Sequence, residues 1–559
     1  MSHDVVIRNG FVVDGSGLGA YRADVGIVGD RIARIGRITS KGTVDIDAEG
    51  HVVTPGFIDV HTHLDAQLFW DHPGTNSCWH GVTTAVMGNC GFTLAPASEA
   101  ERLLVVRNLE RAEDISGKAL AAGIDWSWTS FPEYLDTVEG LPKGINYVSL
   151  LGHSALRTHV MGERAFGEQA TDDDLRRMEA HLRDALRAGA AGFSTARTIH
   201  HRTSDDRPVA SRVAAWSEVD RMVRVMGDEG TGLFQYVEDP PPPELADARR
   251  DELIALAVDT GVPFAMGANS NARRAMDTLE RCRAAGGRMF GVAHPRGIGT
   301  MSSFRTQLPF DRLPVWSDFR ALHLDEQLRQ LHDPEVVARL VRAAHDGPYG
   351  VAVGGEARPP EFARMRVLDA PVPPNPTVAE VAAARAVDPV EAMIQLAVES
   401  NLDQFFVQTL QAFDHDEVGA LLCHPDVVVG FSDSGAHVSQ MADASIQTHL
   451  LAHWVRQRGT FTFAEAVRML TLAPARACGL HDRGMVREGL VADLNVIDPA
   501  TVAPAMPTVV HDLPAGETRI EQRSVGIAAT LVGGQVTIRG GEHTGAFPGK
   551  LLRARTGQP

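Results

Sequence analysis

Two histidines, His61 and His63, are spaced so that both could bind one metal ion. They directly follow the apolar run 57–60, which we expect to be a strand. In an extended chain, residues two apart point to the same side, so the two imidazoles could reach the same cation. The alternative is a chance pair of half-buried histidines. The strand-like run 53–60, which follows a segment of short strands, favours metal binding.

A cysteine at a second strand end could supply another ligand. Cys90 follows the expected strand 83–87, and its neighbours Gly88 and Gly91 let the backbone bend tightly. A thiolate is a good zinc ligand, and a bound cation keeps it deprotonated. The alternative is a small buried core cysteine, which is common in proteins.

Asp433 lies in the sequence Ser-Asp-Ser-Gly at 432–435, directly after the expected strand 427–431. A carboxylate beside a metal could orient a water molecule, accept its proton and return that proton to a leaving nitrogen. The same four residues are also good turn chemistry, so an Asx turn or a helix cap is the alternative. The two interpretations are compatible, and we favour Asp433 as the catalytic residue.

Other polar side chains near the ends of expected strands are candidates for substrate binding. A histidine there could orient the substrate, and an arginine could hold a substrate carboxylate through two hydrogen bonds. Satisfied structural histidines and a solvated polar loop are the alternatives. The candidates are His153, Arg197, His201, Arg202, Gln235, His294 and Arg296.

Eight strand-like runs alternate with helical stretches, which is typical of βα units and a parallel sheet. In one helical stretch, Leu175, Met178, Leu182 and Leu186 form an apolar stripe. Eight such units predict an α/β fold, a (β/α)8 TIM-like barrel, in which active sites lie at the carboxyl ends of the strands. The runs are 57–60, 83–87, 146–150, 192–195, 232–237, 262–266, 288–292 and 427–431.

The two ends of the chain show short strands with hairpin signals, such as Gly533-Gly534. Neither end has enough strands to bury a sheet face alone. We therefore predict that residues 1–55 and 485–545 pair into a small β-sandwich domain, which brings the termini together, and that residues 56–484 form the barrel. The segment 296–425 is too long for a loop, so we expect a helical insertion capping the barrel mouth.

The composition argues against several partners. The chain has 559 residues and a formal net charge of −18. A chain this acidic is not expected to attract nucleic acid or an anionic membrane surface. Its five cysteines are scattered without a disulfide pattern, which fits a reducing compartment. No signal peptide or membrane-spanning stretch is evident. We expect a cytoplasmic protein with a small-molecule substrate and no nucleic-acid or membrane partner, and a homo-oligomer is compatible with the sequence.

Several motifs occur here in one combination. The sequence TPGFIDVHTHLD at 54–65 resembles the opening of the amidohydrolase superfamily. Four further segments are similar to its N-acyl-D-amino-acid deacylase, or D-aminoacylase, branch: GVTTAVMGNCGFTLAP (81–96), LGHSALR (151–157), GFSTAR (192–197) and GFSDSGAHV (430–438). The resemblance covers nearly the whole chain, and its motifs are specific in combination rather than singly.

The resemblance implies a zinc site. In that family, the residues matching His61, His63, Cys90 and Asp433 bind metal, and the cysteine replaces the carboxylated lysine of many relatives. Of this chain's own residues, none of the four lysines lies at the end of an expected strand, which disfavours a lysine carbamate. The lysines are Lys41, Lys118, Lys143 and Lys550.

One part of the family's pattern is missing. Further metal-binding histidines are expected on the fifth and sixth strands, but Gln235 stands at the first of these positions. No histidine lies between His201 and His294 to take either place. We therefore expect about one zinc ion per chain, and a second ion is in doubt.

The resemblance implies hydrolysis of the amide bond of N-acyl amino acids of D configuration, by a metal-bound water with Asp433 as general base and acid. Another amide, a cyclic imide or a lactone hydrolysed at the same site is the alternative, since loops and insertions set specificity on this fold. A non-catalytic binding protein on a degenerate barrel is an alternative of another class. The joint presence of two histidines, a cysteine and an aspartate argues against that degeneration.

Overall fold

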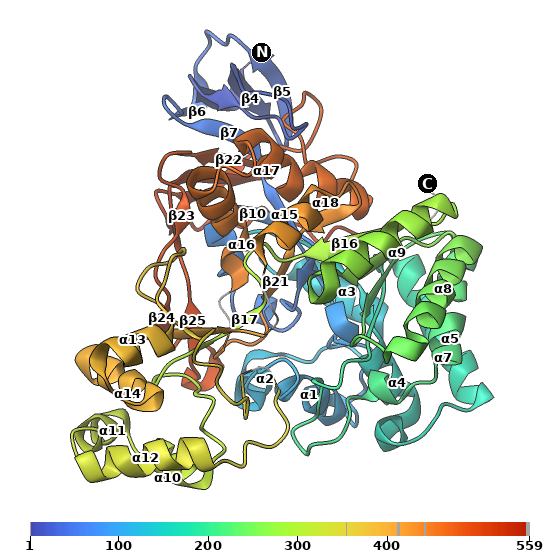
Figure 1. The fold of residues 1–559 in the computed structure, drawn as a ribbon. Helices are drawn as coiled ribbons and strands as arrows, with labels where there is room; N and C mark the ends of the chain where they lie inside the picture. Colours follow the sequence, from blue (N-terminus) through green and yellow to red (C-terminus); the bar gives the residue numbers. More distant parts are fainter. Residues whose placement is uncertain (1, 354, 411–413, 441–442, 555–559) are drawn as a thin grey trace.

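The computed structural model describes residues 2–353, 355–410, 414–440 and 443–554 (Figure 1). Its central strands are parallel and pair in chain order. Each of the eight predicted runs overlaps one of these nine strands, and the ninth, β12, directly follows the run at 146–150. They are β8 (Phe57–Asp59), β10 (Val82–Met87), β11 (Asn146–Ser149), β12 (Leu151–Gly152), β13 (Gly192–Ala196), β14 (Leu233–Val237), β15 (Phe264–Gly267), β16 (Met289–Ala293) and β20 (Val427–Val429).

The last strand of the series, β20, is linked back to the first, β8, through short strands that extend both. One residue, Leu150, separates β11 from β12. Likewise, β9 (His61–Thr62) follows β8 after one residue, and β21 (Phe431–Ser434) follows β20 after one residue. These two short extensions, β9 and β21, pair with each other in parallel. The residues expected to do chemistry therefore lie at the carboxyl ends of neighbouring parallel strands.

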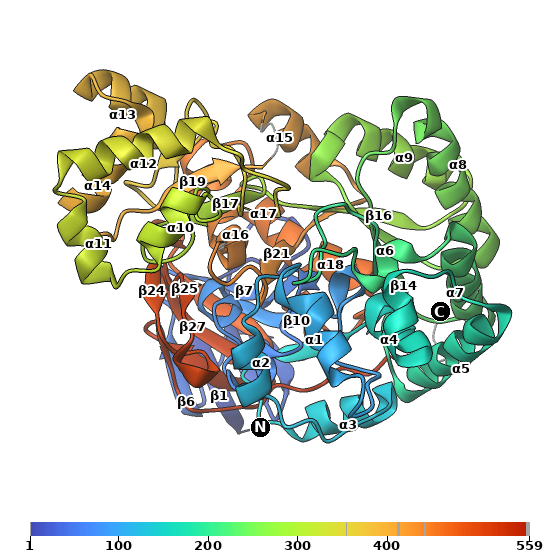
Figure 2. The same ribbon diagram turned by 90° about the horizontal axis from the view of Figure 1, so that it is seen from below.

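Helices cover the outer side of these strands (Figures 1 and 2). Helix α5 shows why: Met178, Leu182 and Leu186 of its predicted apolar stripe are buried, and Thr171 closes its amino end with a capping box. The helices are α3 (Phe131–Gly140), α5 (Asp172–Ala188), α7 (Trp216–Glu229), α8 (Pro243–Thr260), α9 (Ala272–Ala284), α15 (His415–Cys423), α17 (Phe463–Leu470) and α18 (Leu472–Ala477).

Strands from both ends of the chain share one small core. Val5 and Ile27 from the first end pack in one buried cluster with Leu494 and Leu531 from the second. One sheet contains β1 (His3–Arg8), β4 (Asp24–Val28), β5 (Arg31–Gly36) and β6 (Gly42–Asp47). The other includes β7 (Val52–Pro55), β22 (Leu494–Ile497), β27 (Ile527–Val532) and β28 (Gln535–Arg539).

The prediction that the termini lie together is wrong (Figure 1). After β29 (Glu542–His543), the chain leaves the small sheets and runs along the parallel strands. There Leu551 bridges in parallel to Tyr147, and the Ala554 N–H donates to the Gly189 carbonyl. This tail is held by backbone hydrogen bonds. Such bonds do not require alternating apolar and polar side chains, so the sequence does not predict the position of the tail.

The insertion after β16 forms a lobe with its own core around Trp316, Phe310 and Phe406. The predicted helices are present, and so is a small antiparallel sheet that was not predicted. The lobe lies to one side of the parallel strands (Figures 1 and 2). Its elements are β17 (Gly299–Ser302), β18 (Arg366–Val367), β19 (Phe406–Thr409), α10 (Pro314–Arg320), α11 (Leu324–Gln330), α12 (Pro334–Asp346), α13 (Val378–Arg385) and α14 (Pro389–Glu399).

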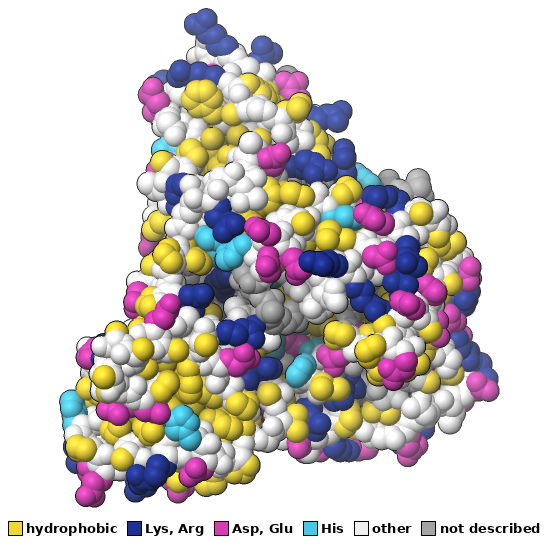
Figure 3. All heavy atoms as spheres, viewed as in Figure 1, with side chains coloured by type: hydrophobic (Ala, Val, Ile, Leu, Met, Phe, Trp, Pro, Cys, Tyr) yellow, Lys and Arg dark blue, Asp and Glu magenta, His cyan; other side chains and the backbone are white. Residues whose placement is uncertain are grey.

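The base of this lobe contacts the loop at 111–114. Gln307 Nε2 donates to Asp114 Oδ1 at 3.0 Å, and Arg111 Nε lies 3.2 Å from Glu356 Oε2. Between the lobe and the helices that cover the parallel strands, the surface is hollowed, with positive and negative side chains interspersed around it (Figure 3). Within the described ranges, every helix is too short or too polar to cross a bilayer.

Candidate metal centre

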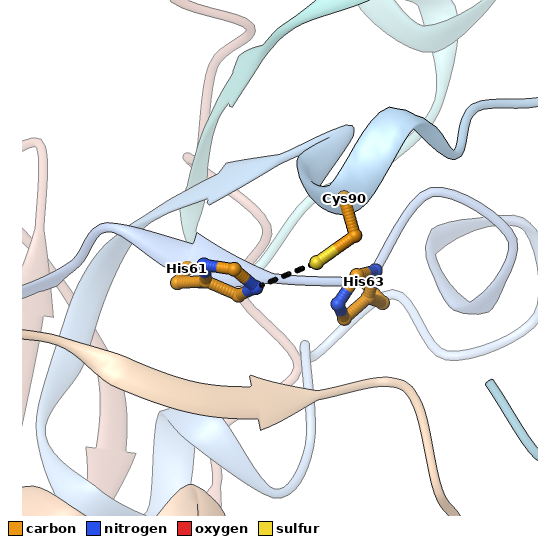
Figure 4. Close-up of side chains that lie close together, drawn as sticks. All are labelled: His61, His63 and Cys90. Carbon is orange, nitrogen blue, oxygen red and sulfur yellow. Dashed lines mark hydrogen bonds between the residues drawn. The ribbon is translucent and has the colours of Figure 1, made fainter. Parts of the chain in front are cut away.

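His61, His63 and Cys90 converge at the carboxyl ends of the first two strands (Figure 4). The two histidines project from the segment after β8, and Cys90 lies in the turn η3 (Asn89–Gly91) after β10. One ligand atom from each of the three side chains lies within 4.8 Å of the other two. The Cys90 Sγ is 3.4 Å from His61 Nε2. All three residues are buried, so their lone pairs are turned away from bulk water and toward one another.

Asp433 reaches the same point from β21. Its Oδ1 lies 3.3 Å from His61 Nε2 and 3.4 Å from His63 Nε2. The bond lengths of a tetrahedral zinc ion place its ligand atoms about 3.4–3.6 Å from one another. The Asp433–His61, Asp433–His63 and Cys90–His61 separations are therefore close to those of ligands on one ion.

Backbone geometry brings these side chains together. Cys90 (φ 55°) and Asp433 (φ 51°) both adopt the left-handed region, which non-glycine residues seldom occupy and which is enriched at functional sites. Gly435 lets the chain pass close to the first strand: a Cβ there would lie 2.5 Å from the His63 carbonyl oxygen. The turn of Cys90 and the turn of Asp433 are thus both held in conformations that the surrounding contacts must stabilise.

Burial and charge set the protonation of the four groups. Burial lowers the pKa of His61 to about 3 and raises the pKa of the Cys90 thiol to about 12. Burial opposes ionisation of Asp433, but the His63 and His61 imidazoles hold its pKa below the usual range. Burial also opposes protonation of His63, yet Glu113 and Asp433 raise its pKa well above the ordinary value. Without a cation, His63 therefore carries the positive charge that balances Asp433.

Glu113 is a site residue that the sequence analysis missed. It follows helix α1 (Arg102–Glu110) and is 1% exposed. Its carboxylate lies 3.6 Å from His63 Nε2, 3.9 Å from His201 Nε2 and 3.5 Å from His437 Nε2. Burial raises the pKa of Glu113 to about 8. No motif or strand end marks this residue, because it reaches the centre from the long segment between the second and third strands.

Gln235 lies next to Cys90, and its contact is to the backbone. Its Oε1 accepts the Cys90 N–H at 2.8 Å, and Ser194 Oγ accepts the Gly91 N–H at 2.9 Å. Asp65 Oδ2 holds the other side of the same turn by accepting the Gly88 N–H at 2.9 Å. Gln235 thus positions the cysteine turn from the strand position where a metal-binding histidine had been expected.

His153 is fully buried, and both of its ring nitrogens have protein partners. Nδ1 lies 2.9 Å from Thr195 Oγ1, and Nε2 lies 2.8 Å from Glu218 Oε1. Arg157 Nη1 donates to the other oxygen of Glu218. Neither nitrogen of His153 is left for a substrate in this arrangement, which locks α4 (His153–Met161) to α7.

This buried cluster should contribute measurably to stability. Glu218→Gln keeps the side-chain shape but removes the charge that faces Arg157, so we expect a loss of about 1.5–3 kcal/mol. Urea unfolding followed by circular dichroism measures the change against Glu244→Gln, a matched substitution at an exposed position of α8. Equal unfolding midpoints for the two variants would contradict this assignment.

The remaining candidates lie on two loops. His201, Arg197 and Arg202 follow β13, where Arg197 Nη1 donates to the Ala214 carbonyl at 2.6 Å and Arg202 Nη1 lies 3.3 Å from Asp206 Oδ1. His294 and Arg296 follow β16, where the Arg296 N–H donates to His294 Nδ1 at 3.1 Å. Of these five residues, His201 lies near the candidate metal ligands: its Nε2 is 3.9 Å from Glu113 Oε1.

Parallel strands whose carboxyl ends carry histidine, cysteine and aspartate together are typical of metal-dependent hydrolases. The model of the amidohydrolase family matches residues 45–538 of this chain. The chain therefore belongs to the amidohydrolase family, and it is a hydrolase that acts on amide carbon–nitrogen bonds. The alternative of a non-catalytic binding protein loses its support.

Three relatives illustrate the similarity. The D-aminoacylase of Alcaligenes xylosoxydans xylosoxydans is 28% identical over 565 residues, which cover 99% of this chain and 98% of the relative. The N-acyl-D-glutamate deacylase of Bordetella bronchiseptica, solved with zinc and a phosphonate mimic of the tetrahedral intermediate, is 25% identical, with a TM-score of 0.65 and coverage of 99% and 100%. A D-aminoacylase structure described with a binuclear metal center is 25% identical, with a TM-score of 0.64 and the same coverage.

Proposed function

We propose that this chain hydrolyses the amide bond of N-acyl-D-amino acids with the help of one tightly held zinc ion. The observation that carries the proposal is the convergence of His61, His63, Cys90 and Asp433 at separations that suit ligands of one cation. The names of the relatives support the substrate class: they act on N-acyl-D-glutamate or are D-aminoacylases. We also propose that the parallel strands close into a (β/α)8 barrel, because their pairing returns to its first strand.

The donor set fits zinc. Two imidazoles, a thiol and a carboxylate are the groups that zinc binds in proteins, and all four are withdrawn from solvent. When bound, the ion supplies Lewis acidity, which activates water near neutral pH and polarises an acyl carbonyl. His61, His63, Cys90 and Asp433 would hold it, and the thiol and His63 would give up their protons to do so.

Asp433 is the proton carrier of the proposed reaction. Its lowered pKa keeps the carboxylate ionised at neutral pH, so it can orient a water molecule and accept its proton. The same carboxyl group then donates this proton to the departing amine nitrogen. Because Asp433 is buried beside both histidines, the proton stays within the site during this transfer.

A cationic side chain would recognise the substrate carboxylate. Arg202 and Arg197 lie on the loop that also carries His201, and Arg296 lies after β16. We propose that this loop and the segment after β16 form the substrate side of the site, with His201 and His294 beside the arginines. A bidentate contact from an arginine would distinguish an N-acyl amino acid from a neutral amide.

A substrate panel tests the proposal. We expect N-acyl-D-amino acids to release free amine faster than their L enantiomers, and the corresponding carboxamides to react more slowly by roughly tenfold to a hundredfold, since a charge-assisted contact is worth about 1.5–3 kcal/mol. Removing metal with a chelator should abolish the release, and added zinc should restore it. Faster turnover of lactones or cyclic imides would favour the alternative substrate class, whereas undiminished activity without metal would exclude the metal mechanism.

A further inference from the structure

Asp59 is a buried carboxylate at the end of the first parallel strand, two residues before His61. It is the last residue of β8, and its side chain is fully buried. The groups that donate to its oxygens are uncharged: the backbone N–H of His61, the side-chain amide of Gln447 and the hydroxyl of Ser432. A carboxylate buried among uncharged donors is less favourable than an apolar side chain of similar size. Stability alone therefore does not explain this residue.

The contacts of Asp59 reach beyond its own turn. Its Oδ1 accepts the His61 N–H at 3.3 Å, a local contact that is typical of an Asx turn. Its Oδ2 accepts a hydrogen bond from Nε2 of Gln447 at 3.0 Å, across 388 residues of sequence. Gln447 is fully buried in the short helix α16 (Ile446–His449). The carboxylate thus connects the backbone of His61 to a helix that follows the last parallel strand.

Ser432 connects Asp59 to the turn that carries Asp433. The Ser432 hydroxyl oxygen accepts the Ser434 N–H at 3.1 Å, and the hydroxyl donates its own hydrogen to Asp59. The carbonyl of Ser434 in turn accepts the His63 N–H at 2.8 Å. These contacts lie on both sides of Asp433 in β21. A single carboxylate is therefore linked by hydrogen bonds to the segments that carry both histidines and the aspartate of the proposed zinc site.

We propose that Asp59 is a positioning residue of the zinc site and that Gln447 holds Asp59 in place. The inference rests on the proposed function, which makes His61 and Asp433 ligands of one ion. Because the donors to Asp59 come from separate elements, the carboxylate fixes His61 relative to Asp433 before an ion binds. Ligands that are already in place bind a metal more tightly than ligands that must be ordered. An apolar residue would leave three buried donors without an acceptor and would release this constraint.

Zinc affinity of the full chain tests this role without a substrate. Asp59→Leu removes the acceptors with a side chain close in size, so the Kd for zinc should rise roughly 10–100-fold. Asp59→Asn keeps an oxygen for the His61 N–H, and the Gln447 amide can turn to accept from the new amide. This conservative variant should therefore recover most of the wild-type affinity. Gln447→Met should raise the Kd about tenfold. Equilibrium dialysis against free zinc, followed by elemental analysis, measures each Kd.

Gln522→Met is the matched control. Like Gln447, Gln522 is buried, donates through Nε2 to one oxygen, the Ala505 carbonyl at 2.8 Å, and has an Oε1 atom without a hydrogen-bond partner among the described residues. Its substitution should lower stability to a similar degree and leave zinc affinity unchanged. Kinetics at saturating zinc give a second readout. Misplaced ligands should lower kcat of Gln447→Met roughly tenfold and leave KM unchanged, because Gln447 acts through Asp59.

The outcomes separate this role from the proposed function. Wild-type zinc affinity in folded Asp59→Leu and Gln447→Met overturns the positioning role alone. An equal loss of affinity in Gln522→Met also overturns it, because the effect would then be general destabilisation. Zinc binding that depends on Asp59, in a chain inactive on N-acyl-D-amino acids, supports the role and overturns the substrate class. A wild-type chain that binds no zinc overturns both. If Asp59→Leu fails to fold by circular dichroism, Gln447→Met carries the test, since it keeps the carboxylate.

Discussion

Replacing Asp433 by asparagine is expected to lower kcat by at least about a hundredfold while leaving the protein folded. Asparagine has nearly the same shape, so the turn at 432–435 should keep its hydrogen bonds. It has no charge to accept a proton from water and cannot return one to the amine nitrogen. General acid–base catalysis contributes about 10²–10⁴-fold, which sets the size of the expected loss. Steady-state kinetics with the best substrate of the panel measures it.

Metal loss could imitate this effect, because Asp433 lies 3.3 Å and 3.4 Å from the two histidines. The variant must therefore be assayed at a zinc concentration that restores the wild-type metal content. Ser432→Ala, next to Asp433 in the same turn, serves as a matched control for damage to the turn itself. A metal-replete Asp433→Asn enzyme with near-wild-type kcat would falsify the assignment of Asp433 as the proton carrier.

The parallel strands could be predicted from the sequence because buried strands are short apolar runs bounded by turn residues. Each of the eight runs overlaps a strand of the structure, with ends that differ by at most two residues. The C-terminal tail could not be predicted. Leu551 and Ala554 are held by backbone hydrogen bonds, which depend on the position of the tail and leave no side-chain pattern.

Within the candidate site, the strand-end residues were predictable and the loop residues were not. His61, His63, Cys90 and Asp433 each follow a recognisable strand, so topology alone brings them to one edge. Glu113 follows a helix within a segment of nearly sixty residues between two strands, where spacing carries no information about position. The role of Gln235 was hidden for another reason: its partner is the Cys90 N–H, and a backbone contact leaves no trace in the sequence.

Cys90→Ala is expected to weaken zinc binding by at least about a hundredfold with the fold preserved. The sulfur lies 3.4 Å from His61 Nε2 and is grouped with both histidines, so its loss removes a ligand from the proposed zinc site. Even changes to residues that only support metal ligands cost about 10–100-fold in affinity, so the loss of a ligand should reach or exceed that range. Because the other ligands remain, some binding at high free zinc should persist.

The matched control is Cys282→Ala, which also removes a fully buried sulfur. Cys282 lies in α9, where it packs beside Gly287 and far along the chain from any proposed ligand. A small loss of packing should lower its thermal stability slightly and leave zinc affinity unchanged. Equilibrium dialysis of both variants, with unfolding followed by circular dichroism, separates the two effects. If Cys90→Ala bound zinc as tightly as Cys282→Ala, the Cys90 sulfur would be a packing group in the turn after β10, and the ion would depend on His61, His63 and Asp433 alone.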